Sequence, residues 1–160
     1  MPASTEVPLR NRSGKVVAYA MVDDEDAESV LAHRWSLTNG YPASRFGGRL
    51  WYLHRWLLGE PPGQTDHINR NKLDCRRSNL RTVSDAENKQ NVPARGGTSR
   101  HRGVWWLDCK QRWVAGFGCK QGHCHRRWFR TEREAAEYIA KWRRENLPFS
   151  VDEKLCSPTM

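Results

Sequence analysis

Residues 64–88 read QTDHINRNKLDCRRSNLRTVSDAEN, and the spacing of four polar residues in this stretch is the strongest guide to the fold. Asp66 and His67 are adjacent, Asn79 follows His67 by twelve positions, and Asn88 follows Asn79 by nine. An imidazole can accept a proton from water near neutral pH. Carboxylate and carbonyl oxygens suit a hard divalent cation. The pattern predicts His67 as a base that Asn79 orients, and a metal held by Asp66 and the carbonyl oxygen of Asn88.

The residues around these four predict a β-hairpin followed by a helix. Residues 64–68 and 79–83 read as two short strands, joined by the polar loop 69–78. Ser84-Asp85-Ala86-Glu87 has the form of a capping box, so a helix is expected to begin at Ser84 and to carry Asn88 in its first turn. Neighbouring side chains on a strand point to opposite faces, so a bulge or the strand end must bring Asp66 and His67 into one site.

The same stretch resembles the HNH endonucleases of phages and mobile introns, in their His-Asn-Asn variant. The resemblance is carried by residues 65–69 (Thr-Asp-His-Ile-Asn), 73–81 (Leu-Asp-x-Arg-x-Ser-Asn-Leu-Arg) and 88–91 (Asn-x-x-Asn). It implies a β-hairpin and a helix around one metal ion, and hydrolysis of phosphodiester bonds in double-stranded DNA. Because the expected ligands are hard oxygens, the metal is expected to be magnesium or manganese.

Other polar residues of this region are open to more than one interpretation. Asp74 fits a turn residue that binds its own loop backbone. His54 lies in Tyr-Leu-His-Arg (52–55), a stretch common in these nucleases; a structural role in support of the hairpin is favoured over a catalytic one. Four basic residues near the site are expected to contact phosphates: Arg70, Lys72, Arg76 and Arg77.

The charge of the chain favours a polyanionic partner. Its 160 residues carry a net charge of +9. Residues 1–50 sum to zero, residues 51–92 to +2 and residues 93–160 to +7. The last third is therefore expected to anchor the chain on nucleic acid. The polar N-terminus does not predict a signal peptide, and no apolar run is long enough to cross a membrane, so no membrane partner is expected.

The five cysteines include no C-x-x-C pair, which favours free thiols in a reducing cytoplasm. The expected location is the cytoplasm of a host cell, for a protein encoded by a phage or mobile element. A zinc site is the alternative use of a cysteine and histidine set. Its ligands would be Cys119, His123, Cys124 and His125, and because their crowding on a hairpin suits tetrahedral coordination poorly, zinc is not expected.

Composition divides the chain into segments. Residues 1–50 are expected to form an α+β segment that packs on the nuclease motif of residues 51–92. Its elements would be a strand at 15–22, a short helix from 23 to about 33, and a hairpin after residue 41 that breaks at Gly47-Gly48. Pro, Gly and Ser mark residues 93–99 as a linker.

Residues 100–147 predict a second module, followed by a tail at 148–160. Strands are expected at 102–107, 112–119 and 125–130, and a helix at 131–146. Thr131-Glu132-Arg133-Glu134 is a second capping box at the start of that helix. Small apolar residues at helical spacing, such as Ala135 and Ala136, would let the helix lie close to a sheet.

This module resembles the APETALA2-type DNA-binding domain of plant ethylene-response factors, over residues 99–106, 112–115 and 129–136. The resemblance implies a three-stranded sheet in the major groove with a helix packed behind it, and alternation places Val104 and Trp106 on the helix side. The expected DNA-binding residues are Arg100, Arg102, Trp105, Arg112, Arg126 and Arg127. The positions that differ from the arginines of the plant domains are Trp105, Leu107, Gly116 and Gly118. The resemblance therefore favours phosphate contacts by Arg112, Arg126 and Arg127 over base reading by bidentate arginine.

Together these observations predict an α+β protein, with a ββα-metal nuclease core followed by a small three-stranded antiparallel sheet and a helix. The expected function is metal-dependent hydrolysis of double-stranded DNA, by nicking or double-strand cleavage, targeted by the C-terminal module. A monomer or weak dimer is expected. The alternative is a non-catalytic, sequence-specific DNA-binding protein on a nuclease-derived scaffold, which the four intact site residues disfavour.

Overall fold

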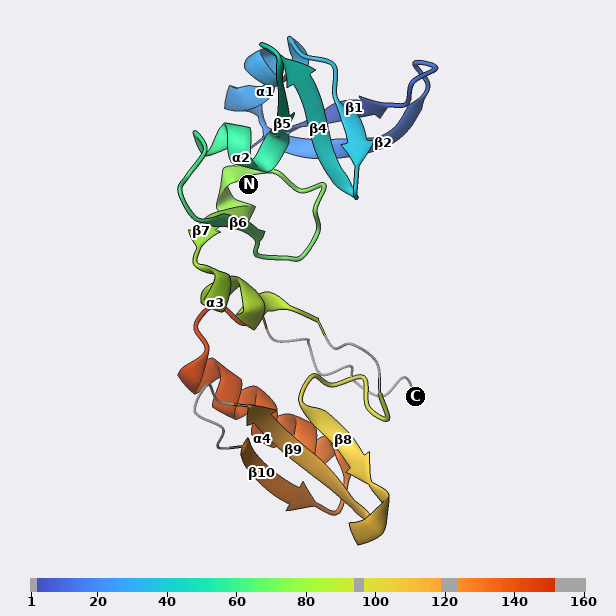
Figure 1. Ribbon diagram of the computed structural model, residues 1–160, viewed down its shortest axis with the longest axis vertical. Coiled ribbons are helices and arrows are strands. Elements are labelled where there is room, and N and C mark those ends of the chain that lie inside the picture. The colour runs from blue at the N-terminus through green and yellow to red at the C-terminus, as the bar shows by residue number, and fades with distance from the viewer. Residues whose placement is uncertain (1–2, 94–96, 119–123, 152–160) are drawn as a thin grey trace. The chain divides into compact units, whose positions relative to one another are not determined.

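The computed structural model describes residues 3–93, 97–118 and 124–151, and the chain divides into two compact units, residues 1–89 and 90–160 (Figure 1). Both units combine short antiparallel sheets with helices, which is the α+β class expected from the sequence. The boundaries expected for the linker and for the second module remain predictions.

The first unit opens with a two-stranded antiparallel sheet of β1 (Ser4–Arg10) and β2 (Val16–Asp23). The helix α1 (Asp24–Leu31) follows at once, with acidic residues in its first turn, where the helix dipole favours them. Strand β1, which contains Pro8, was not predicted from the sequence. A strand tolerates a residue without an N–H at a position where no neighbouring strand needs that donor.

A three-stranded antiparallel sheet comes next, with β3 (Ser36–Thr38), β4 (Tyr41–Phe46) and β5 (Arg49–Tyr52). Its β4–β5 turn lies at Gly47-Gly48, as predicted, and both glycines have positive φ angles. Trp35 is fully buried in the core of the unit, and its Nε1 donates to the carbonyl of Val30 at 2.7 Å. The core is completed by residues from both sheets and from the short helix α2 (Leu53–Leu57).

The predicted nuclease hairpin consists of β6 (Gln64–His67) and β7 (Leu80–Val83), followed by α3 (Asp85–Asn88). Ser84 caps α3 and exchanges hydrogen bonds with Glu87, so the predicted capping box is confirmed. The α-helical part is four residues long, and the chain then continues as a 3-10 turn, η2 (Lys89–Asn91). Asn88 therefore ends a single α-helical turn.

The loop between β6 and β7 is held by the edge of β2. The Met21 N–H donates to the Leu73 carbonyl at 2.8 Å, and the Cys75 N–H donates to the Met21 carbonyl at 2.8 Å. Asp23 accepts the Arg77 N–H at 2.8 Å. Cys75 is fully buried in this region, and burial raises the pKa of its thiol to about 12. The N-terminal segment therefore packs on the nuclease loop and helps to shape it.

The second unit is a three-stranded antiparallel sheet with one helix. Its strands are β8 (Val104–Leu107), β9 (Arg112–Gly118) and β10 (Cys124–Phe129), in the order β10-β9-β8. Figure 1 shows α4 (Glu132–Asn146) along one face of this sheet, and Thr131 forms the predicted capping box with Glu134. The core between sheet and helix contains Val104, Ala115, Ala135, Ala136 and Ile139. The predicted three strands and helix are confirmed, and so is the position of Val104 on the helix side.

None of the described helices is both long enough and apolar enough to span a membrane. Among the described cysteines, Cys75 and Cys109 are free thiols. The alternative zinc ligands fall largely outside the described residues: Cys119 and His123 are not described, and neither is the side chain of Cys124.

Candidate active site

His67 is the last residue of β6 and is buried, with 5% of its surface exposed. Its ring lies 5.0 Å from the ring of His54 and 6.0 Å from the ring of Tyr41, measured between centroids. Burial lowers the pKa of His67 below its ordinary value of 6.5, while Asp66 and Asp74 act in the opposite direction. His67 is therefore neutral at physiological pH, which is the form that accepts a proton.

Asp66 pairs with Arg81 across the hairpin. The two residues are opposite each other in the β6–β7 register, and both the Nε and the Nη2 of Arg81 donate to Oδ2 of Asp66, at 2.9 and 2.6 Å. The register is regular, with His67 opposite Leu80. Of the two ways considered for bringing Asp66 and His67 together, the structure shows a strand end at His67 and no bulge between these pairs.

Asn79 binds the backbone on both sides of the loop that follows His67. Its Oδ1 accepts the Asn69 N–H at 2.9 Å and its Nδ2 donates to the Asp74 carbonyl at 2.8 Å. Its own carbonyl accepts the Ile68 N–H at 2.8 Å. These bonds hold the backbone of the residues that immediately follow His67.

Asp74 binds the loop backbone as the sequence indicated, because its Oδ1 accepts the Arg76 N–H at 3.4 Å. Its carboxylate accepts from the Nε and Nη2 of Arg76, at 2.8 and 2.7 Å, and from the Asn69 amide at 2.8 Å. The hydrogen bonds from Arg76 lower the pKa of Asp74, against the opposing effect of its burial. The carboxylate therefore remains ionised and keeps the loop closed.

Asn88 ends α3, which packs against both β6 and β7. Its side-chain Nδ2 donates to Oε1 of Gln64 at 2.8 Å, at the start of β6. This bond ties the helical turn to the strand that carries Asp66 and His67.

His54 is a functional candidate whose position beside His67 could not be read from the sequence. It lies in α2, is 7% exposed, and packs against the rings of Tyr41, Tyr52 and His67. Its Nδ1 is buried and has no hydrogen-bond partner among the described residues. Burial, with a smaller effect from His67, lowers its pKa from 6.5 to about 4. His54 therefore presents a neutral ring to the proposed base.

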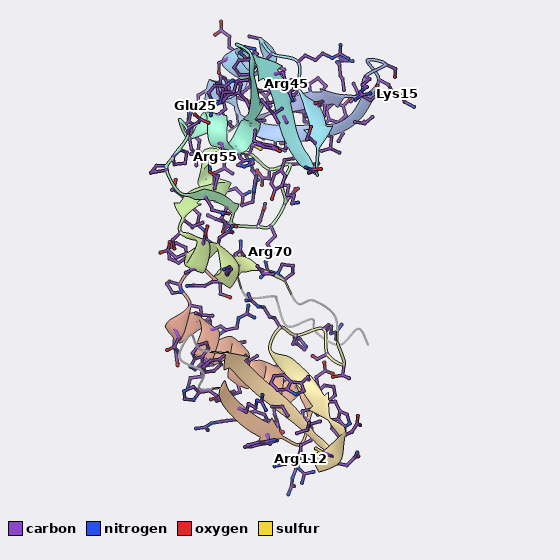
Figure 2. The ribbon with its side chains drawn as sticks, in the orientation of Figure 1. Lys15, Glu25, Arg45, Arg55, Arg70 and Arg112 are labelled. Atoms are coloured by element: carbon purple, nitrogen blue, oxygen red, sulfur yellow. The ribbon has the colours of Figure 1, made fainter. Side chains whose placement is uncertain are left out.

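The four basic residues expected at phosphates differ in their surroundings. The Arg76 guanidinium binds Asp74, and the Arg77 guanidinium binds Asp26 at 2.8 and 2.7 Å. The Lys72 ammonium lies 4.2 Å from the ring centroid of Tyr41. Arg70 follows the strand end in a left-handed backbone conformation, with its N–H donating to the His67 carbonyl at 2.9 Å (Figure 2). Arg76 and Arg77 thus fasten the loop through carboxylates of their own unit, whereas Lys72 lies on an aromatic face.

The acidic residues at the start of α1 bind this same loop. Asp23, Glu25 and Asp26 gather their carboxylate oxygens within 4.8 Å of one another. They face Arg77, which donates its backbone N–H to Asp23 and its guanidinium to Asp26. Their negative charge is therefore used to fasten the β6–β7 loop.

The six residues expected to bind DNA in the second unit fall into distinct groups. The Arg126 guanidinium lies 5.9 Å from the ring centroid of Trp105, on the sheet face opposite α4. A Cβ on Gly116 would come within 2.8 Å of the Trp105 ring, so the glycine leaves room for that indole. Arg112 and Arg100 are exposed, Arg112 at the start of β9 (Figure 2).

The other two arginines of this set have internal contacts. Arg102 donates from Nη1 to the carbonyls of Gln90 and Val92, both at 2.8 Å. Arg127 lies 5.3 Å from the ring centroid of Tyr138 on α4, so it belongs to the helix side of the sheet. The sequence placed all six together; the structure separates these two from the exposed sheet face.

Comparison with known proteins adds an independent observation. The family model described as HNH endonuclease matches residues 52–90, a stretch that contains His54 and all four predicted site residues. The match supports an HNH nuclease, and with it a DNA-cleaving hydrolase, in this part of the chain. Searches of curated proteins and of solved structures found no match.

Proposed function

We propose that this protein is a metal-dependent DNA endonuclease that hydrolyses phosphodiester bonds with His67 as the general base. The observation that carries the proposal is the buried, neutral imidazole at the end of β6, within the stretch that matches HNH endonucleases. A neutral imidazole can take a proton from the attacking water while the water oxygen bonds to phosphorus and the bond to the 3′ oxygen breaks.

Asp66 and the carbonyl of Asn88 would hold a divalent ion in this proposal. Both are oxygen donors, and they come from elements that pack together, β6 and α3, so the donor set suits magnesium or manganese. When bound, such an ion would supply positive charge to the scissile phosphate and the leaving oxygen. Arg81 fixes the Asp66 carboxylate in orientation through its two hydrogen bonds.

The second unit would locate the substrate, as an APETALA2-type sheet. Its support is the sheet face opposite α4, which carries Trp105 and Arg126 side by side and an exposed Arg112. Arg100, in the segment before β8, is exposed as well. Residues 93–160 also carry +7 of the net charge. Guanidinium groups on an exposed strand can bind phosphates, and such contacts would raise affinity without taking part in the chemistry.

A nicking assay on supercoiled plasmid tests the proposal. The full chain should nick DNA with magnesium or manganese and stop in excess EDTA, and Asp66→Ala should need a higher metal concentration for the same rate. Asp85→Ala is the matched control, because this exposed carboxylate lies in the first turn of α3 and not at the site. Full cleavage in excess EDTA would contradict the proposed metal.

A non-catalytic DNA-binding protein is the second candidate, and the Asp66–Arg81 ion pair favours it. A guanidinium already neutralises the proposed metal ligand. Duplex binding by the full chain with no nicking at any magnesium or manganese concentration would select this alternative. Metal-dependent nicking that His67→Ala abolishes would exclude it.

A further inference from the structure

The first unit contains a groove that the nuclease chemistry does not use. It has a volume of about 800 Å³ and is lined by residues from β1, β2, β3, β4 and β5, and from the segments beside them. Four of its lining residues are charged, and all four are arginines: Arg10, Arg12, Arg34 and Arg45. None of the described residues that line it is acidic. Its apolar lining includes Val17 and Leu37, which are 50% and 44% exposed.

Hydrogen bonds to backbone carbonyls hold two of these arginines in place. The Arg34 guanidinium donates to the Asn11 carbonyl at 2.9 Å, and the Arg10 guanidinium donates to the Gly14 carbonyl at 3.0 Å. The Asn11 side chain accepts from the Ser13 hydroxyl and the Lys15 N–H, which orders the β1–β2 turn. The turn that carries Arg12 is therefore fixed against the segment that carries Arg34.

Arg12 and Arg45 complete the groove with exposed guanidinium groups. Arg12 lies in the β1–β2 turn and Arg45 in β4. Within the described part of the chain, no hydrogen bond or ion pair holds either side chain. Both groups can thus bind a ligand without breaking an internal contact.

The zero net charge of residues 1–50 conceals a separation of charge. Five of the six acids lie between positions 23 and 28, where three of them surround Arg77, whereas the groove collects only positive charge. Figure 2 shows Lys15, in the turn next to the groove, and Glu25 at opposite sides of the unit. Like charges held together repel one another, and an anionic ligand relieves that repulsion.

We propose that this groove binds the sugar–phosphate backbone of duplex DNA, away from the scissile phosphate. Arginine pairs with phosphate oxygens through two parallel N–H bonds, which a row of backbone phosphates can accept. Exposed apolar side chains such as Val17 and Leu37 can contact deoxyribose between those phosphates. The inference rests on the proposed function, because it takes the nuclease substrate as the ligand.

The test compares duplex affinity at several salt concentrations for the full chain and its Arg12→Ala/Arg45→Ala double variant. The slope of log affinity against log salt should fall by about 0.9 for each phosphate that the variant no longer binds, and the affinity by roughly tenfold per phosphate at 0.1 M salt. A hydroxyl-radical footprint should also become shorter at one end. Arg49→Ala is the matched control, since Arg49 lies in the same sheet and pairs with Glu60.

Two contrary results are distinguishable. If the unaltered chain cleaves DNA while the double variant keeps its slope, affinity and footprint, the groove proposal is overturned and the proposed function stands. If the unaltered chain neither binds nor cleaves a duplex, the proposed function fails, and this proposal with it. Groove-dependent binding that is tighter for duplex RNA than for duplex DNA would overturn the assignment to DNA.

Discussion

The nuclease hairpin and the C-terminal sheet use polar residues in opposite ways. In the hairpin, Asp66, His67, Asp74 and Asn79 are all buried, and the bonds to Asp66, Asp74 and Asn79 come from their own loop and strands. On the sheet, Arg112 and Arg126 are exposed, and so is Arg100 in the segment before β8. Buried groups that are hydrogen-bonded to their surroundings keep one geometry, which suits catalysis. Exposed charges adapt to a partner, which suits affinity.

The sharpest test of this contrast is His67→Ala. Removing a positioned general base should lower the single-turnover cleavage rate by about 10²–10⁴-fold, with almost no change in duplex affinity. Single-turnover cleavage and anisotropy titrations measure the two quantities on the same protein. His125→Ala, an exposed histidine on β10, is the control. A near-normal cleavage rate in His67→Ala would contradict the assignment of His67 as the general base.

The buried histidine beside it should appear in the pH dependence of stability. The folded state holds His54 neutral down to its pKa of about 4, whereas an unfolded histidine binds a proton below 6.5. The free energy of unfolding should therefore fall as pH falls from 6.5 to about 4, by up to roughly 3 kcal/mol for this one group. Denaturant unfolding of the unaltered chain and of His54→Phe, which keeps a ring in place, should differ in this window.

His125→Phe serves as the exposed control for that experiment. It should leave the dependence of the unfolding free energy on pH as it is in the unaltered chain. An equal dependence in His54→Phe would mean that another group, with His67 the nearest, accounts for the acid sensitivity.

On the sheet, the expected effect is on affinity alone. Arg112→Ala/Arg126→Ala in the full chain should flatten the salt slope by about 0.9 for each phosphate that is no longer bound, with an unchanged cleavage rate at saturating DNA. Arg133→Ala is the control, because Arg133 pairs with Glu137 on the outside of α4. A cleavage rate that falls at saturating DNA would contradict the proposal that the sheet contributes to affinity and not to the chemistry.

The two capping boxes offer the smallest and most symmetrical test. Ser84→Ala and Thr131→Ala should each lower stability by about 1 kcal/mol. Only Ser84→Ala should also raise the metal concentration needed for cleavage, because α3 carries Asn88. Thermal unfolding and metal titrations of cleavage measure both effects. Equal effects of the two substitutions on the metal titration would contradict the assignment of Asn88.

What the sequence could predict was local. Both capping boxes follow from residues three positions apart, and the β4–β5 turn follows from two adjacent glycines. The pairing of Asp66 with Arg81 depends on the hairpin register. The contact of His54 with His67 depends on how a helix packs on a strand. The periodicity of the sequence does not predict either of these two contacts.

Two other features were hidden for different reasons. Strand β1 contains Pro8, and proline usually argues against a strand. The net charge of residues 1–50 is zero, and this sum does not show that the acidic and basic residues lie in different places on the unit. The arginine groove appears only when β1, β3 and β4 bring those charges together.

The bonds between β2 and the β6–β7 loop have a consequence for the order of folding. Met21 and Leu73 are far apart in the chain, and a contact of that separation forms late because it closes a long loop. During synthesis, β1 and β2 emerge before the β6–β7 loop that binds to them. A fragment limited to residues 52–90 would lack the bonds from β2 to this loop, so the folded unit around the matched stretch is larger than the stretch itself.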